Sequence, residues 1–135
     1  MTWEVVKSYI WVAVGSALGG MSRFWVSNAV GERVGFTFPW GTIVINISGS
    51  FIIGVFTALT LPEGKLTSSR IFVTQFCMVG LCGGYTTFSA FSRETLNLVR
   101  AGQWLWAGGN VAISIVACLV AVWLGFIVGQ ILNRL

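Results

Sequence analysis

Hydrophobic residues occur in long runs along this chain, and polar residues collect between the runs. A helix needs roughly 20 apolar residues to cross the hydrocarbon core of a membrane, where each backbone polar group must be bonded internally. Four runs reach that length, and short connectors with turn-forming and charged residues separate them. The pattern predicts one domain over residues 1–135, with transmembrane helices at residues 8–30, 40–61, 71–99 and 104–132.

The composition excludes most water-soluble functions. Hydrophobic residues make up 56% of the chain and charged residues only 9%, whereas a soluble domain has about 25% charged residues. The eight Lys and Arg residues are scattered rather than clustered, so no nucleic-acid partner is expected despite a pI of 9.4. The chain has no His and no Asp, and nothing resembles a nucleophile with its base, so we do not expect an enzyme.

Lys and Arg residues are distributed almost evenly between the two sides of the predicted bundle. Four lie on the side of both termini and three on the other, namely Lys7, Lys65, Arg70 and Arg134 against Arg33, Arg93 and Arg100. A strong excess normally decides which side is cytoplasmic. Two interpretations stay open: one weakly signalled orientation, or a chain that inserts both ways and pairs with its inverted copy. Four helices are few for enclosing a polar pathway, which favours a homodimer.

Small residues recur four positions apart in all four runs. The pairs are Gly15 and Gly19, Ser50 and Gly54, Gly80 and Gly84, and Gly125 and Gly129. Such pairs let helix backbones approach closely in lipid, where apolar burial alone does not drive association. The spacing therefore predicts tight helix packing without indicating a function.

Two polar side chains within the first two runs are candidates for function. An intramembrane Arg is costly, so Arg23 is expected to face a water-filled cavity or a protein partner, unless its long side chain reaches the interface. Asn46 lies near the middle of the second helix, and its amide is suited either to joining helices or to binding an anion. Thr42 precedes Asn46 by one helical turn on the same face.

The third run does not read as a simple helix. Paired glycines are followed by two threonines, which predicts a break near residues 83–87. Non-helical backbone at this depth is tolerated only when it is buried in protein or lines an ion path. Beyond the break, Phe88 and Phe91 share a face with Ser89 and Ser92 beside them. Ring edges and hydroxyl groups can hold a small anion, although a Phe pair at this spacing is more often packing.

Hydrogen-bond donors outnumber acceptors within the runs. In the fourth run, Asn110, Ser114 and Cys118 form a weakly polar stripe with a spacing of four. All four carboxylates are expected at or beyond the ends of the charge-poor apolar windows, the third of which ends at Ser92: Glu4, Glu32, Glu63 and Glu94. A proton-coupled carrier normally has a buried acid, so this pattern favours an anion pathway. The three cysteines are interpreted as small buried hydrophobic residues.

Three segments together resemble the Fluc, or CrcB-type, family of fluoride channels. They are GLCGGYTTFSAFS (Gly80 to Ser92), GSALGGMSRF (Gly15 to Phe24) and PWGTIVINISG (Pro39 to Gly49). The resemblance covers essentially the whole chain. It implies an all-α membrane protein with four transmembrane helices, the third of them broken, that forms an antiparallel dual-topology homodimer. It also implies passive fluoride export across the cytoplasmic (inner) membrane and a structural Na⁺ ion at the dimer interface.

The resemblance assigns roles by motif position. The fluoride pore would contain these residues: Phe88, Phe91, Asn46, Ser89, Ser114, Thr42 and, in the vestibule, Arg23. The backbone carbonyl groups of Gly83 and Thr86 from both subunits would hold Na⁺. Ala90 stands where many members have Thr or Ser, and Asn110 where many have Tyr, so the polar track of this chain differs there.

Two other classes of protein compete with a fluoride channel. A small multidrug or cation exporter shares the four-helix, dual-topology plan, but the first run here contains Arg23 and no Glu. A structural membrane subunit would explain the glycines, but not the cluster of Thr, Ser and Phe at a predicted break. The expected partners are therefore fluoride, a second copy of the chain and the lipid bilayer.

Overall fold

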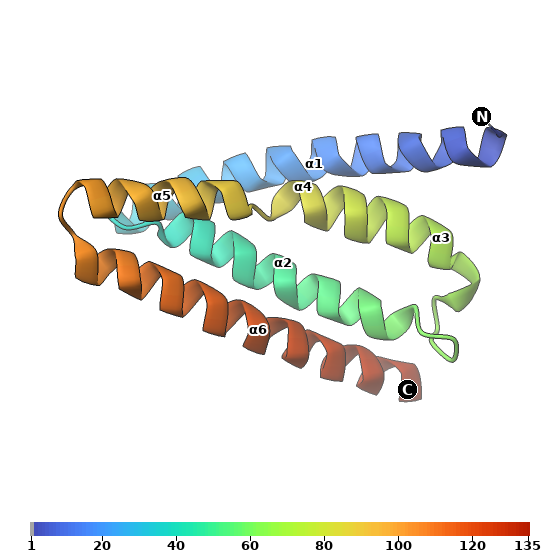
Figure 1. The fold of residues 1–135 in the computed structure, drawn as a ribbon. Helices are drawn as coiled ribbons and strands as arrows, with labels where there is room; N and C mark the ends of the chain where they lie inside the picture. Colours follow the sequence, from blue (N-terminus) through green and yellow to red (C-terminus); the bar gives the residue numbers. More distant parts are fainter. Residues whose placement is uncertain (1) are drawn as a thin grey trace.

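The computed structural model describes residues 2–135, and every regular element in that range is helical. In chain order the elements are α1 (Trp3–Val34), α2 (Trp40–Leu59), η1 (Thr67–Ser69), α3 (Arg70–Phe72), η2 (Val73–Cys82), α4 (Gly83–Tyr85), α5 (Phe88–Arg100) and α6 (Trp104–Arg134). The elements from η1 to α5 follow one another in a single direction, so the chain forms four long segments: α1, α2, the third segment from η1 to α5, and α6 (Figure 1). Both termini lie at the same end of the molecule, beside the connection between α2 and α3 (Figure 1).

Three of the four segments are long and apolar enough to cross a membrane. They are Trp40–Leu59, Thr67–Arg100 and Trp104–Arg134. Although α1 has 32 residues, it is not among them, because its Ser, Gly, Trp and Tyr residues and Arg23 lower its hydropathy. The four-helix arrangement is thus present, whereas a membrane crossing by α1 stays a prediction.

Large apolar side chains cover the outside of the chain rather than its interior. Phe24 and Trp25 on α1 are exposed, as are Leu105, Val116 and Leu119 on α6. Soluble monomers rarely expose contiguous apolar patches of such extent. This surface is suited to lipid or to another protein.

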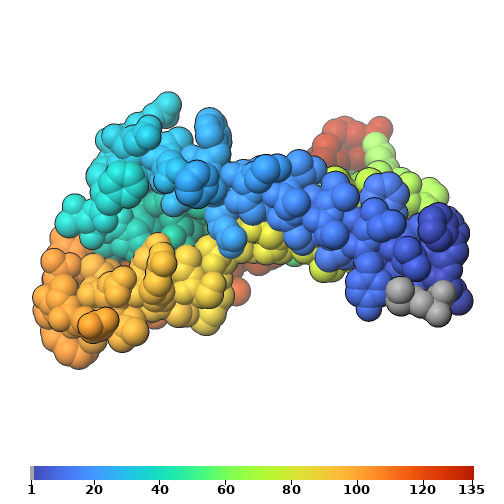
Figure 2. Space-filling model, turned by 90° about the horizontal axis from the view of Figure 1, so that it is seen from above, coloured from blue at the N-terminus to red at the C-terminus, as the bar shows by residue number. Residues whose placement is uncertain are grey.

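Glycines bring α1 into backbone contact with η2, a π-helical stretch, and with α4. A Cβ atom added to Gly80 would lie 3.0 Å from the Cα of Gly15, and one added to Gly84 would lie 2.6 Å from the Ser16 carbonyl oxygen. A Cβ on Gly19 would collide with the Leu81 carbonyl oxygen. The space-filling view shows α1 (blue) lying across this yellow segment (Figure 2). Close approach of this kind stabilises helix pairs in lipid.

The second glycine contact joins α2 to α6. A Cβ on Gly54 would collide with the Val122 carbonyl oxygen, and one on Gly125 would collide with the Phe51 carbonyl oxygen. The predicted small-residue pairs therefore lie at helix contacts. The molecule consists of two tightly packed helix pairs, α1 with the third segment and α2 with α6.

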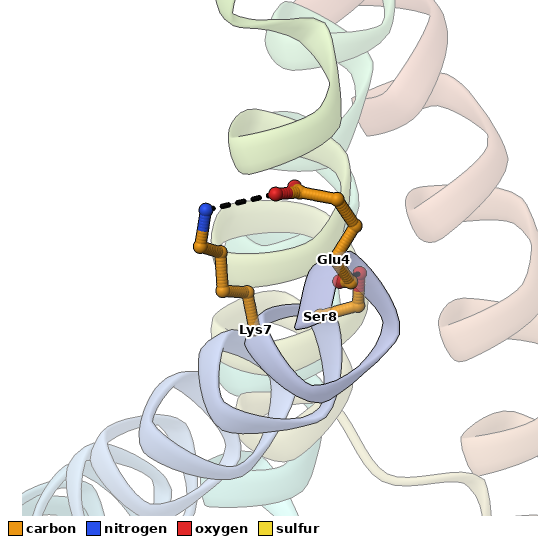
Figure 3. A network of polar contacts seen from close by, with 3 residues as sticks. All are labelled: Glu4, Lys7 and Ser8. Atoms are coloured by element: carbon orange, nitrogen blue, oxygen red, sulfur yellow. Dashed lines mark hydrogen bonds and ion pairs between the residues drawn. The ribbon is translucent and has the colours of Figure 1, made fainter. Parts of the chain in front are cut away.

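Polar side chains anchor the end of the molecule that holds both termini. Lys7 donates to the Glu4 carboxylate at 2.9 Å, and Ser8 donates to the Glu4 carbonyl (Figure 3). Asn133 on α6 donates to the Ala58 carbonyl at 3.0 Å and accepts from the Lys65 N–H at 3.0 Å. The Glu4 contacts lie within α1, whereas the two Asn133 contacts join α6 to the end of α2 and to the loop that follows it.

Candidate functional site

The third segment leaves the helical conformation at two residues. Thr86 has φ −77° and ψ 156°, and Thr87 has φ −153° and ψ 114°, so both are extended. The two glycines placed in the expected break, Gly83 and Gly84, are helical instead. At Gly84 the missing side chain leaves room for α1, which packs directly against this residue. The threonines, rather than the glycines, are the residues at which the helical hydrogen bonding is interrupted.

Asn46 occupies the hydrogen-bonding positions that the interruption leaves open. Its Oδ1 accepts the Thr87 N–H at 2.8 Å, and its Nδ2 donates to the Thr87 carbonyl oxygen at 3.1 Å. One side chain on α2 therefore pairs with both polar backbone groups of one residue. Buried backbone groups must find such partners, because an unpaired one costs about 1–3 kcal/mol.

Thr87 also begins the next helix. Its Oγ1 accepts the Ala90 N–H at 3.1 Å, which caps α5, and lies 3.1 Å from the Ser89 Oγ. Threonine is a favoured N-cap residue because its oxygen satisfies a free N–H of the first turn. The capped first turn of α5 carries Phe88, Ser89 and Phe91, so the break and the polar–aromatic cluster form one local structure.

A first cavity, of 480 Å³, lies beside the break and is here called the phenylalanine cavity. Its lining includes Asn46, Cys82, Thr86, Phe88, Phe91, Ser114 and Cys118. The two rings lie with centroids 5.3 Å apart and planes tilted by 48°. Their environments differ, because Phe91 is 9% exposed whereas Phe88 is 77% exposed. Within one chain the Phe91 ring is thus enclosed by protein, whereas the cavity is open to the surroundings at the Phe88 ring.

A chain of polar side chains leads from α5 to this cavity. Thr95 donates to the Phe91 carbonyl at 2.8 Å, and Asn110 donates to the Thr95 Oγ1 at 2.8 Å. Ser114 reaches the Asn110 Oδ1 at 3.4 Å. Asn110 is 1% exposed and joins α6 to α5 from the interior. At a position where the resemblance led us to expect Tyr in many members, this chain therefore uses a short amide that contacts Thr95 and Ser114.

A second cavity, of 570 Å³, lies on the α1 side of the break and is here called the arginine cavity. Its lining includes Arg23, Thr42, Thr87, Ser89, Arg93 and Glu94. Arg23 is half-buried, and its Nη1 lies 3.5 Å from the Thr86 carbonyl oxygen, the long limit of a hydrogen bond. The guanidinium group thus borders a cavity, one of the two positions considered for it.

The structure divides the expected pore residues between the two cavities. Asn46, Phe88, Phe91 and Ser114 line the phenylalanine cavity, whereas Arg23, Thr42 and Ser89 line the arginine cavity. Thr87 borders both. Although Thr42 and Asn46 are one turn apart on α2, they face different cavities.

The expectation that all carboxylates lie at or beyond the ends of the apolar windows is wrong for Glu94. Because α5 continues to Arg100, Glu94 lies inside Thr67–Arg100, a helical segment that is long and apolar enough to cross a membrane. The Thr42 hydroxyl donates to Glu94 Oε1 at 2.9 Å, and Glu94 Oε2 is buried without a hydrogen-bond partner. The position of Glu94, one turn after Phe91 on the same helix, was the signal that could have placed it here.

The backbone carbonyl groups expected to hold Na⁺ are compatible with a cation. Gly83 loses its usual helical donor, because the Thr87 N–H four residues later donates to Asn46 instead. The Thr86 carbonyl receives only the long contact from Arg23 among the hydrogen bonds of residues 2–135. Hard cations prefer oxygen ligands, and two copies of the chain would supply four such oxygens.

The lining of the phenylalanine cavity supplies neutral hydrogen-bond donors and ring edges rather than charged acceptors. Hydroxyl groups, an amide and ring edges line the phenylalanine cavity, which has no carboxylate in its lining. Two arginines border the neighbouring cavity. Within the described residues, no cluster of three or more Cys or Glu side chains could hold a metal ion. Donor-rich, acceptor-poor surroundings favour a small anion.

Comparison with known proteins identifies the family. The model of the family described as CrcB-like protein, Camphor Resistance (CrcB), matches residues 10–126, and the chain belongs to that family. It is 55% identical over 130 residues to a protein of Methylocella silvestris named fluoride-specific ion channel FluC, with 94% of this chain and 96% of the relative covered. The predicted family is thus confirmed, and with several apolar helices the chain is a multi-pass membrane protein.

Two further relatives carry the same name. A protein of Opitutus terrae is 54% identical over 127 residues, with 94% of this chain and 96% of the relative covered. A protein of Rhodospirillum rubrum is 51% identical over 131 residues, with 94% of this chain and 98% of the relative covered. Each match spans nearly the whole length of both proteins, including the break and both cavities.

Proposed function

We propose that this protein is a passive fluoride-selective ion channel that lowers cytoplasmic fluoride by letting the anion leave the cell. The observation that carries this conclusion is the Asn46–Thr87 pairing, which supports a helix break between a cavity lined by Phe91 and Ser114 and a cavity lined by Arg23. The site alone supports a small anion. Fluoride in particular is supported by the relatives named fluoride-specific ion channels.

The geometry suggests how an anion is taken out of water. Arg23 and Arg93 border the arginine cavity and raise the local anion concentration there. Thr87 and Ser89 form a hydroxyl pair at the boundary between the cavities. In the phenylalanine cavity, the Ser114 hydroxyl and the positive ring edges of Phe88 and Phe91 replace lost water. Neutral donors hold the anion without binding it too tightly for conduction.

The proposal is tested by measuring ion flux. Purified protein is reconstituted into liposomes loaded with potassium fluoride, and release is followed with a fluoride electrode after valinomycin is added to carry K⁺. We expect fluoride release far above that of protein-free liposomes, no chloride release under matched conditions, and no proton uptake. Equal chloride release, or proton uptake that depends on a drug, would contradict the proposal.

The alternative of a small multidrug or cation exporter is not favoured. The relatives that match nearly the full chain are named fluoride-specific ion channels. Glu94, the acid inside a spanning segment, lies on α5 and not on α1, and it accepts a hydrogen bond from Thr42. An exporter would move protons with its substrate, which the flux assay detects.

We also propose that two copies assemble in antiparallel orientation in the inner membrane. Phe88 is 77% exposed at the open side of the phenylalanine cavity, so a second copy would complete the surroundings of the ring. The near-equal Lys and Arg counts support insertion in both directions. Labelling of a single introduced terminal cysteine in whole cells tests this, because dual topology makes about half of the molecules reactive from each side. Labelling from one side only would contradict dual topology.

A structural Na⁺ ion between the two copies is proposed on the carbonyl groups of Gly83 and Thr86. The ion would neutralise carbonyl dipoles that the helix break leaves without their helical N–H donors, and so would stabilise the assembled pair. We expect the dimer to lose thermal stability when Na⁺ is replaced by N-methylglucamine, as followed by size-exclusion chromatography after heating. Equal stability in the two cations would argue against a sodium site.

A further inference from the structure

The π-helical stretch η2 brings two free cysteines of one segment together. Cys77 and Cys82 are five residues apart, and both belong to Val73–Cys82. In an α-helix, residues five apart point in directions that differ by about 140°. In a π-helix each N–H bonds to the carbonyl group five residues earlier, so residues five apart lie above one another on neighbouring turns.

The backbone shows this five-residue relation at the end of η2, where the second cysteine lies. The Gly83 N–H donates to the Met78 carbonyl group, five residues earlier. A Cβ atom added to Gly80 would lie 3.1 Å from the Gln75 carbonyl oxygen, which is also five residues earlier. The two cysteines have the same spacing within the same stretch, so their side chains leave the helix on one face.

The two thiol groups are neighbours in an environment that does not favour charge. Cys77 is the side chain whose charge would act on the Cys82 thiol, which indicates that the two sulfur atoms lie close together. Cys82 is 3% exposed and lines the phenylalanine cavity, whereas Cys77 is half-buried outside that lining. No Asp or Glu belongs to the lining, so a cation bound here would have no counter-charge. A neutral ligand with a soft central atom fits better, because sulfur prefers soft partners.

We propose that Cys77 and Cys82 form a dithiol site for trivalent arsenic, which binds by bridging the two sulfur atoms. An arsenical with two hydroxyl groups on arsenic is uncharged. Two As–O bonds and two S–H bonds break, two As–S bonds form, and two molecules of water leave. Arsenic stays trivalent, so no oxidant or reductant takes part. The site does not depend on the proposed conduction of fluoride.

Phenylarsine oxide is the probe, because it is apolar and its hydrate carries two hydroxyl groups on arsenic. Reduced protein in detergent is incubated with it and then desalted in excess 2-mercaptoethanol, which removes arsenic that is held by a single sulfur. Retained arsenic is measured by elemental mass spectrometry, before and after treatment with 2,3-dimercaptopropanol. The variants are Cys77→Ala and Cys82→Ala. The matched control is Cys118→Ala, since Cys118 is a free cysteine that lies on α6 rather than on η2.

The unaltered protein should retain about one arsenic atom per chain and release it to the dithiol but not to the monothiol. Cys118→Ala should retain the same amount. Cys77→Ala and Cys82→Ala should each lose at least about tenfold, because one sulfur cannot chelate and the advantage of the second bond is gone. Size-exclusion chromatography confirms that each variant is folded.

Three results would overturn the proposal: no retained arsenic in the unaltered protein, undiminished retention in Cys77→Ala, or loss of retention in Cys118→Ala. If Cys82→Ala does not fold, Cys77→Ala decides the question alone, because Cys77 is half-buried and lies outside the cavity lining. A protein that releases no fluoride from liposomes would contradict the proposed channel function and leave this measurement unaffected.

Discussion

Asn46 pairs with Thr87 as a neighbouring peptide group would, accepting its N–H at 2.8 Å and donating to its carbonyl at 3.1 Å. A helix interrupted in the middle of a membrane-spanning segment leaves backbone groups that lipid cannot satisfy. Here a single amide on α2 satisfies both groups of one residue. The extended backbone of the third segment is therefore maintained from outside that segment.

Two substitutions of Asn46 distinguish the contribution of its amide to protein stability from its effect on the passage of an anion. Asn46→Leu preserves volume but leaves the Thr87 N–H and carbonyl unpaired, which should destabilise the protein by about 2–6 kcal/mol and abolish flux. Asn46→Asp keeps an acceptor for the Thr87 N–H and adds negative charge beside the cavity. This variant should therefore lose most of its fluoride flux while its melting temperature falls less than that of Asn46→Leu.

Fluoride release from liposomes and thermal unfolding followed by Trp fluorescence measure these two effects. Ser48→Ala is the matched control, because Ser48 lies on the same helix outside both cavity linings and contacts the Tyr85 hydroxyl. A normal melting temperature for Asn46→Leu would show that the pairing does not support the break.

The two phenylalanines should respond differently to the same substitution. Phe91→Ile removes a ring that is 9% exposed, so it should lower stability by about 1–3 kcal/mol and reduce flux. Phe88→Ile removes a ring that is 77% exposed within one chain, so it should reduce flux with little effect on the fold of that chain. Fluoride release and dimer content by size-exclusion chromatography are measured for both. Unchanged release in both variants would mean that the rings serve only in packing.

Two adjacent glycines on α1 provide a matched test of helix packing. A Cβ on Gly19 would collide with the Leu81 carbonyl oxygen and lie 2.8 Å from the Tyr85 N atom, whereas one on Gly20 would meet nothing within 4 Å. Gly19→Ala should force α1 away from α4 and lower the melting temperature sharply. Gly20→Ala should leave it unchanged or slightly raised, since Ala favours helix. Equal melting temperatures would show that α1 does not pack closely here.

The hydrogen bond from the Thr42 hydroxyl to Glu94 should stabilise the folded protein. Thr42→Val leaves Glu94 Oε1 without its 2.9 Å donor, and Oε2 is already buried without a partner. The lost bond to a carboxyl group should cost about 1.5–3 kcal/mol. Thr57→Val is the control, because the Thr57 hydroxyl donates only within its own helix, to the Ile53 carbonyl. The difference between the melting temperatures of the two variants reports the Thr42–Glu94 contact, and no difference would argue against it.

Hydrophobic runs and residue spacing were sufficient to predict the helices and their close contacts. The runs predicted four helical segments, and the small residues four apart lie at the helix contacts. The spacing could not distinguish a glycine at a helix break from a glycine needed for close packing. Gly84 was therefore included in the break, although it is helical and touches Ser16.

The order of polar and apolar residues alone determined that this is a helical membrane protein with a donor-rich third segment, because both properties depend on local composition and periodicity. Tertiary structure decided which groups meet. Asn46 and Thr87 are 41 positions apart and Thr42 and Glu94 are 52 apart, and no period along a helix relates such positions. Only the packing of α2 against the third segment brings an amide to the interrupted backbone, places a carboxylate inside the bundle, and divides neighbouring polar residues between two cavities.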